Sequence, residues 1–196
     1  MTNRAQAAIV AVLVVALLAV GLAFLWPVLT SPSPAPAPNA SANANGPISI
    51  ASNFAECANA GYPVMESYPR QCRTTDGRTF SEDIGNELEK QNLIKATDPR
   101  PNATIASPLT VRGVARGTWY FEASFPVELV DLTGATVAQG IAQAQSEWMT
   151  QDFVPFTATL TFTAPTSSTG TLWLRKDNPS GLPENDDALR IPVRFR

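Results

Sequence analysis

The chain of 196 residues contains no histidine and only two cysteines. Without histidine the usual Ser-His and Cys-His nucleophile pairs are excluded, and a zinc site that used both cysteines would still need two further ligands. The sequence also lacks a G-x-S-x-G element and a phosphate-binding glycine loop. Paired carboxylates remain, but no spacing selects a pair. We therefore expect a protein that is not an enzyme and that uses no cofactor or metal.

The chain is also poor in positive charge, with 14 Lys and Arg against 17 Asp and Glu and a formal net charge of −3. No basic surface is expected, so nucleic acid is excluded as a partner. The one acidic stretch, KDNPSGLPENDD at 176–187, lacks the spacing of a calcium-binding EF-hand loop. We interpret residues 177–187 as a solvated turn and leave cation binding there open.

The first thirty residues, in contrast, are strongly apolar. No charge occurs from Ala5 to Leu25, and about 20 helical residues span the roughly 30 Å hydrocarbon core of a bilayer. Arg4 precedes this run, which favours a cytoplasmic N-terminus. We predict a single-pass transmembrane helix over residues 1–29 that anchors the chain to the cell membrane and leaves the remainder extracytoplasmic. A cleaved signal peptide is the alternative, and it exports the same residues.

Residues 30–47 are rich in Pro, Ala, Ser and Asn and carry no charge. This composition cannot bury a core, and its Pro-Ala part favours extended polyproline II structure. We predict a disordered linker that holds the folded part away from the membrane.

Both cysteines lie in the stretch CANAGYPVMESYPRQC, as Cys57 and Cys72. In an oxidising compartment two cysteines are expected to pair. Closing a loop of about 15 residues stabilises a fold by roughly 3 kcal/mol in the chain-entropy model. We therefore predict a structural disulfide between them.

The disulfide belongs to a small module that we assign to residues 48–90. Asp76-Gly77 indicates a hairpin turn. The charged segment 81–91 indicates a connector helix capped by Ser81, with Ile84 and Leu88 packed on a neighbour. The stretch AGYPVMESYPRQC followed by DGRTF resembles a short two-cysteine module of exported bacterial proteins. That resemblance implies export and cysteine pairing, and no activity.

From residue 91 to the end the apolar pattern has a period of two. The clearest alternations run over 156–164 and 189–195, and each predicts a strand with one buried face. Pro192 cannot donate a ladder hydrogen bond, so the last strand is expected at an edge or at a bulge. Further strands are predicted at 93–96, 109–115, 125–131, 137–145 and 171–175, with a turn at 131–134. About seven short strands over residues 91–196 are typical of a mainly β fold, an immunoglobulin-like β-sandwich.

This part of the chain resembles the Gmad2 domain. The similarity lies in IASPLTVRGVARGTWYFEASFPVELVD at 105–131, VAQGIAQAQ at 137–145, FTATLTF and the closing ALRIPVRF. Gmad2 is an immunoglobulin-like family first noted beside spore-germination domains and found in many bacterial envelope proteins. The resemblance implies a non-catalytic role in binding or spacing at the envelope, and it supplies no ligand or catalytic residue.

Exposed aromatic side chains are candidates for stacking against sugars or peptides. If TWYFE at 118–122 is extended, Trp119 and Tyr120 point to opposite sides, and at least one of them belongs to the core. Trp148 lies between two predicted strands and is the most accessible candidate. We retain Trp148, Trp119 and Tyr120 as candidate binding residues, with packing as the alternative for each.

Together these features predict a membrane-anchored binding or interaction module of the bacterial cell envelope. Its ligand would be a cell-wall glycan or an envelope protein. The alternative is a purely structural spacer.

Overall fold

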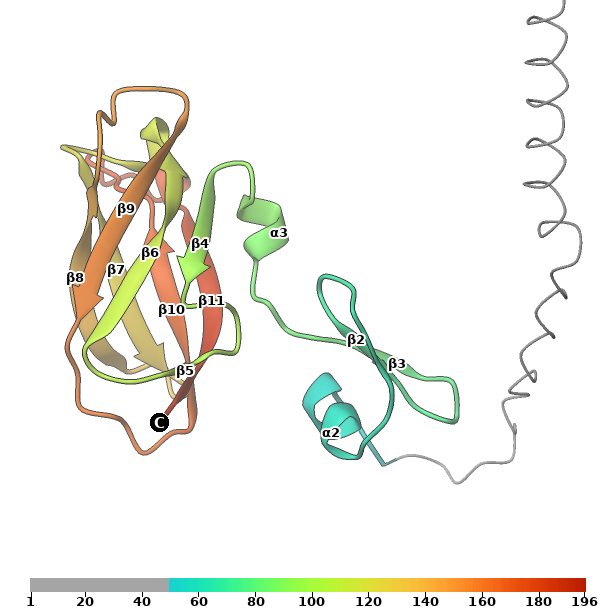
Figure 1. Cartoon of the computed structure of the whole chain (residues 1–196). Helices are drawn as coiled ribbons and strands as arrows, with labels where there is room; N and C mark the ends of the chain where they lie inside the picture. The colour runs from blue at the N-terminus through green and yellow to red at the C-terminus, as the bar shows by residue number, and fades with distance from the viewer. Residues whose placement is uncertain (1–49) are drawn as a thin grey trace, which may run out of the picture. The chain divides into compact units, whose positions relative to one another are not determined.

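The computed structural model describes residues 50–196, all within one compact unit, Asn43–Arg196 (Figure 1). The predicted transmembrane segment 1–29 and linker 30–47 lie outside the described residues. In the described range, no helix has the length and apolar character needed to cross a membrane.

The first folded part is a small module of one helix and three short strands. Its elements are α2 (Phe54–Asn59), β1 (Val64–Met65), β2 (Gln71–Arg73) and β3 (Thr79–Ser81), with strand order β1-β2-β3. Asn53 caps α2, because its side-chain oxygen accepts a hydrogen bond of 2.9 Å from the backbone N–H of Glu56. The hairpin predicted at Asp76-Gly77 is confirmed: β2 and β3 pair antiparallel around it, and Gly77 adopts φ +89°.

The predicted disulfide between Cys57 and Cys72 is confirmed. It joins α2 to β2 over a Cα–Cα distance of 6.0 Å, and both cysteines are fully buried. Within residues 50–196, Ala51 is the one further buried residue of this hydrophobic cluster, and the partly buried Phe54, Tyr62 and Phe80 pack against it. The bridge is therefore a large part of the module's own core.

The connector helix differs from the prediction. Ser81 does not cap it, since Ser81 ends β3 and pairs with Gln71. The helix is the single turn α3 (Glu87–Lys90), which follows Gly85 at φ +68° and Asn86. Ile84 is buried as predicted, but Leu88 is 45% exposed, because the helix starts too late to place the two on one face.

The second part is an eight-stranded sheet. Its strands are β4 (Ile94–Asp98), β5 (Thr104–Ile105), β6 (Leu109–Arg116), β7 (Ser124–Asp131), β8 (Thr136–Ala144), β9 (Phe153–Leu160), β10 (Thr169–Arg175) and β11 (Ala188–Phe195), in the order β4-β6-β9-β8-β7-β10-β11-β5. The sequence predicted all of these except the two-residue β5. The strand predicted at 156–164 lies at 153–160, because the chain leaves the ladder after Leu160.

The sheet folds over to form a β-sandwich. β8 and β9 pair at only two positions, Gln143 with Thr157 and Ala144 with Phe156. At this corner the layer β4-β6-β9 turns to face the layer β8-β7-β10-β11 (Figure 1). The inward side chains of both layers form one core, in which Phe125 makes edge contacts with Phe156 and Tyr120 at centroid distances of 5.0 and 5.2 Å. The mainly β, immunoglobulin-like prediction is thus confirmed.

Pro192 lies near an edge, as predicted. On one side it pairs with Thr171 of β10. On the other side its carbonyl accepts a hydrogen bond of 2.7 Å from the backbone N–H of Asn102, and β5 begins pairing only at Arg194. The missing N–H of proline therefore leaves no gap in the ladder.

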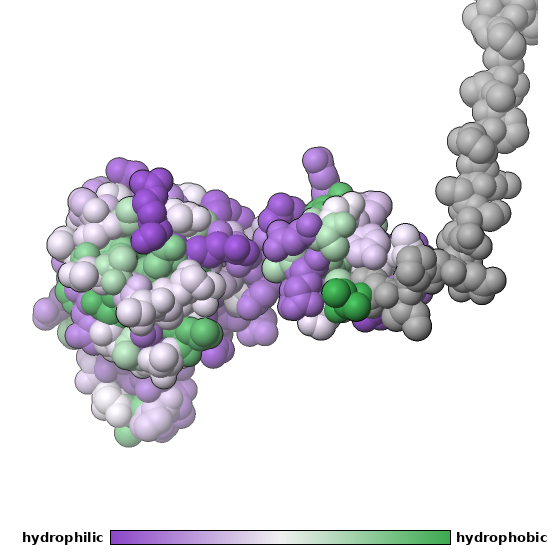
Figure 2. Space-filling model, turned by 90° about the horizontal axis from the view of Figure 1, so that it is seen from below, coloured by the Kyte–Doolittle hydropathy of each residue, from purple (hydrophilic) through white to green (hydrophobic). Residues whose placement is uncertain are grey.

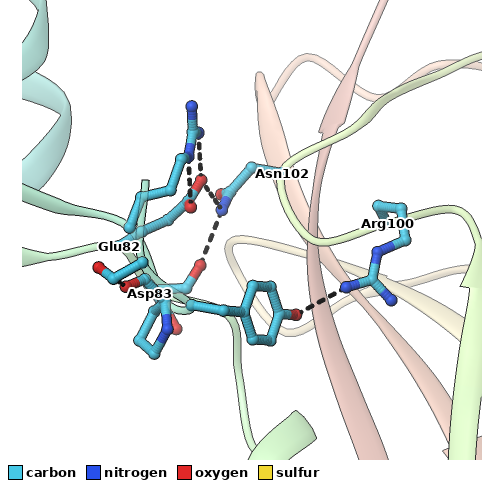
Figure 3. A network of polar contacts seen from close by, with 8 residues as sticks. Glu82, Asp83, Arg100 and Asn102 are labelled. Carbon is cyan, nitrogen blue, oxygen red and sulfur yellow. Dashed lines mark hydrogen bonds and ion pairs between the residues drawn. The ribbon is translucent and has the colours of Figure 1, made fainter. Parts of the chain in front are cut away.

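Polar contacts join the module to the sandwich (Figure 3). The side-chain amide of Asn102 donates to Glu82 Oε1 at 3.2 Å and to the carbonyl of Asp83 at 2.7 Å. Arg100 donates to the hydroxyl of Tyr68 at 2.9 Å and pairs with the buried Glu87 at 2.9 Å. Arg70 also pairs with Glu82 and holds the pKa of that carboxyl below its ordinary value.

Candidate binding site

Three loops gather at one end of the sandwich: residues 117–123, 145–152 and 176–187. The register places them together, since Arg116 pairs with Phe153, Ser124 with Gln143, and Arg175 with Ala188. A hydrogen bond of 3.1 Å from the Asp177 N–H to the Trp119 carbonyl connects two of the loops, and Ala144 at the end of β8 donates to the Ala123 carbonyl at 2.8 Å. We call this surface the loop end.

Large apolar side chains are exposed on all three loops. Phe121 is 43% exposed, Met149 75% and Leu182 50%. Exposed apolar side chains that gather on neighbouring loops are characteristic of interaction surfaces. In immunoglobulin-like domains the loops at one end of the sandwich are also where binding residues are commonly placed.

The same three loops also carry carboxylates. The three loops carry seven acidic residues and one cation, Lys176. The acidic residues are Glu122, Glu147, Asp152, Asp177, Glu184, Asp186 and Asp187. The loop end therefore combines exposed apolar side chains with an excess of acidic residues.

The opposite end of the sandwich has a different character. Its connecting segments, residues 99–103, 106–108, 132–135 and 161–168, contain no acidic residue, and only Asp98 and Asp131 flank them at the strand ends. Figure 2 shows this end, where hydrophobic residues lie among hydrophilic ones. Exposed Leu132 belongs to it. Apolar exposure alone thus does not distinguish the two ends, but negative charge does.

Trp148, the leading sequence candidate, lies at the loop end but is only partly exposed. Its side chain packs against the edge of the core. With Met149 and Tyr120 it lines a shallow hollow of about 350 Å³. The backbone carbonyl of Trp148 also lies against Gly117, where any Cβ would come within 2.3 Å of it. Trp148 therefore both supports the loop and borders the candidate surface.

Trp119 and Tyr120 are corrections to the predicted binding residues, because the structure buries both. Residues 117–119 form a 3-10 turn rather than an extended strand, so the expected alternation fails and both rings enter the core. Tyr120 donates a hydrogen bond of 2.8 Å to the carbonyl of Val154. Burial raises the pKa of its hydroxyl well above the ordinary value. Neither ring is free to stack on a ligand.

Phe121 is the residue that sequence reasoning missed. The two residues after it, Glu122 and Ala123, have φ of 49° and 62°, a conformation that residues other than glycine rarely adopt. They form a tight turn that bridges Phe121 to Ser124 and directs the chain back into β7. A turn of this kind ordinarily uses Asn-Gly, so Glu-Ala gave no local signal.

The acidic loop 177–187 is ordered by its own hydrogen bonds. Asn178 donates to the Leu182 carbonyl at 2.8 Å and to Asp186 at 2.7 Å, and Asp187 pairs with Lys90 at 2.6 Å. Across residues 50–196 there is no group of three or more His, Cys, Asp or Glu side chains arranged to hold a metal ion.

Comparison with known proteins identifies the sandwich. Residues 93–182 match the Gmad2 family, described as the immunoglobulin-like domain of bacterial spore germination. The match spans β4 to β10, and β11 completes the sandwich beyond it. Comparisons with curated proteins and with solved structures gave no match.

Proposed function

We propose that this chain, which carries a Gmad2 domain behind a disulfide-bonded module, is a non-catalytic, membrane-anchored binding module of the bacterial cell envelope. Of the two ligand classes that the sequence suggests, an envelope protein fits the loop end better than a glycan does. The preferred partner presents apolar side chains among basic ones.

The observation that carries this proposal is the charge difference between the two ends of the sandwich. Exposed apolar residues occur at both ends, but seven carboxylates lie on the loops at one end and none on the connections at the other. An apolar centre with a charged surround is the usual composition of a protein interface, and the charge selects a complementary partner.

The extracytoplasmic location is part of the proposal. It is supported by the uncharged run from Ala5 to Leu25 and by the disulfide, a bond that persists in oxidising compartments. Fusing alkaline phosphatase to the C-terminus would test this location directly, since that enzyme becomes active only after export.

A structural spacer is the alternative function. The observation that favours it is the joint in Figure 3, where Asn102 and Arg100 connect the sandwich to Glu82, Asp83 and Tyr68 of the module. A braced joint suits a protein whose task is to hold a fixed distance from the membrane.

Site-specific photo-crosslinking in the full-length chain separates the two functions. A photoreactive residue at Met149 is compared with one at Leu132, which is equally exposed at 75% but lies at the opposite end. We expect Met149 to give a discrete protein adduct in intact cells that weakens as salt rises, because charge steers the contact.

The comparison between Met149 and Leu132 decides between the binding and the spacer function. Adducts of equal yield at both positions, or none at either in a correctly exported protein, would contradict binding at the loop end and leave the spacer function. An adduct lost on neutralising Glu122 and Glu147 to Gln would assign these acidic residues to partner recognition.

A further inference from the structure

The outer face of the sandwich carries an aromatic residue that the loop end does not explain. Trp173 of β10 lies opposite Glu128 of β7 on one side and Arg190 of β11 on the other. All three point away from the core, since their strand neighbours are the buried ones. The guanidinium carbons of Arg175 and Arg190 lie 4.5 and 5.3 Å from the indole centroid. A partly exposed tryptophan with two arginines close to its ring is a potential binding platform.

Hollows lie on both sides of this tryptophan and continue along β11. One, of about 280 Å³, and a second, of about 390 Å³, share Asn86, Trp173 and Arg190 in their walls. A third, of about 460 Å³, meets the second at Asp83 and is lined by Arg194. Since β11 rises by about 3.3 Å per residue, the stretch from Ala188 to Arg194 is roughly 20 Å long. We call these three hollows the β11 groove.

The far wall of the groove is the connector segment 83–90, which the structure fixes against β11. Asn86 donates to the Ala188 carbonyl at 2.9 Å and accepts from the Arg190 N–H at 2.7 Å. Gly85 fits because any Cβ there would lie 1.9 Å from the Arg190 carbonyl oxygen. The wall is therefore formed before any ligand arrives, which reduces the ordering cost of binding.

Two cations in the groove have no carboxylate partner within residues 50–196. Other basic residues beside it are paired: Arg175 with Glu128, Lys90 with Asp187, and Arg70 with Glu82. Arg190 and Arg194 take part in no ion pair of the described chain. They lie four residues apart on one face of one strand, about 13 Å from each other along the groove.

An extended peptide is a poor fit, although the groove follows a strand near the sheet edge. Adding a strand requires free backbone N–H and C=O groups on that edge. Here the Asn86 side chain already bonds the Ala188 carbonyl and the Arg190 N–H. The backbone N–H of Asn102 bonds the Pro192 carbonyl, and β5 pairs with β11 from Arg194. These backbone groups are already paired, so we expect the ligand to be recognised mainly through side chains, by an apolar face and polar substituents.

We propose that the β11 groove binds a linear acidic glycan. A pyranose ring has an apolar face that packs on the accessible part of Trp173, while Arg190 and Arg194 donate hydrogen bonds to carboxylates that recur along the polymer. Five carboxylates also line the groove. Glu82 and Asp187 are held in ion pairs, and Asp83, Glu89 and Asp186 are left to accept from sugar hydroxyls. This site goes beyond the protein interface proposed for the loop end, although Asp186 and Asp187 of loop 176–187 border both surfaces.

The test uses the full-length chain in detergent and three defined probes: a hexasaccharide of alternating uronate and N-acetylhexosamine, peptide-free glycan strands from cell wall that carry lactyl carboxylates, and neutral chitohexaose. Binding is followed by calorimetry and by tryptophan fluorescence. We expect at least one acidic probe to bind saturably and more tightly than chitohexaose. Arg190→Gln and Arg194→Gln should each weaken it about tenfold or more, since each removes hydrogen bonds between a charged donor and a carboxylate.

Arg112→Gln is the matched control, because Arg112 is 61% exposed on β6 and lies outside the groove. An equal loss in this variant would show non-specific charge attraction and overturn the site. Failure of both acidic glycans to bind a folded protein would overturn it as well. A glutamate hexapeptide that binds as tightly as the glycans would replace the glycan by an acidic peptide.

Discussion

The module and the sandwich are stabilised by different means. In the module the buried cluster is Ala51 with the two bonded cysteines, and β1 has only two residues. In the sandwich 22 buried residues from both layers form one core, and neither cysteine belongs to it. A short segment cannot bury enough apolar surface to offset its conformational entropy, so it depends on a covalent link where the larger part depends on packing.

This difference in stabilisation also bears on which residues are available for recognition. The sandwich can expose Phe121 and Met149 and leave Trp173 partly exposed, because none of them belongs to its core. The module instead contributes to the joint and to one wall of the β11 groove through Arg70 and its neighbours. We infer that the module supplements a binding surface that the sandwich alone leaves incomplete.

The largest expected effect is on the sandwich core. Phe125 is fully buried and contacts the rings of Tyr120 and Phe156. Phe125→Ala should lower the free energy of unfolding by about 3–5 kcal/mol, through lost burial and the cavity left behind. Denaturant unfolding followed by tryptophan fluorescence measures it, since Trp119, Trp148 and Trp173 all lie in the sandwich. Phe121→Ala is the control and should change the value by less than about 1 kcal/mol, because Phe121 is 43% exposed.

Removing the bridge should act on the module alone. Cys57→Ser with Cys72→Ser removes about 3 kcal/mol of loop-closure stabilisation and leaves two hydroxyls in the buried cluster. We expect hydrogen exchange over residues 50–80 to lose protection while the tryptophan transition of the sandwich stays in place. If the protection of the module and the stability of the sandwich fell together, the two parts would form one cooperative unit and would not be stabilised separately.

The sequence predicted those parts whose cause is local. Alternation identified the strands around Phe156 and Ile191, and Asp76-Gly77 marked a hairpin through its turn preference. The cysteines predicted their own bond because only one pairing exists. These features depend on neighbouring residues, and one sequence contains that information.

The remainder depends on contacts between distant residues. Asn86 bonds to Ala188 and Arg190, more than 100 positions away, so nothing near Asn86 signals its role. The burial of both Trp119 and Tyr120 follows from one 3-10 turn that breaks the period of two. In the sequence, Trp173 is one residue of the strand predicted at 171–175, because its platform exists only once β7, β10 and β11 lie side by side.

A smaller effect is expected at the joint between the two parts. Asn86 is 8% exposed, and its side chain satisfies two backbone groups of β11. Asn86→Ala leaves both unpaired and should cost about 1–3 kcal/mol, with faster hydrogen exchange at Arg190. Asn92→Ala, an exposed position near the same helix, should leave exchange at Arg190 unchanged. Equal exchange in the two variants would show that Asn86 does not fix the connector to β11.

The smallest effect concerns acid stability at the joint. Burial raises the pKa of Glu87 above its ordinary value, and the ion pair with Arg100 opposes that rise without cancelling it. One of its oxygens, Oε2, has no hydrogen-bond partner among the described residues. The folded protein therefore holds a proton on Glu87 at a pH where the unfolded chain has released it. The stabilisation from that proton is present at low pH and is lost as the pH rises through the folded-state pKa.

Glu87→Gln imitates the protonated form and can still accept from Arg100. At neutral pH the variant should be as stable as the parent chain or more stable, by less than about 1 kcal/mol, because it no longer holds a buried charge. The difference should vanish as the pH falls through the folded-state pKa, where the parent carries the proton itself. Thermal unfolding of both chains between neutral pH and pH 4 measures this. A variant less stable than the parent at neutral pH would mean that the Arg100 ion pair outweighs the burial of the charge, and that the joint is held by electrostatics as the module is held by its bridge.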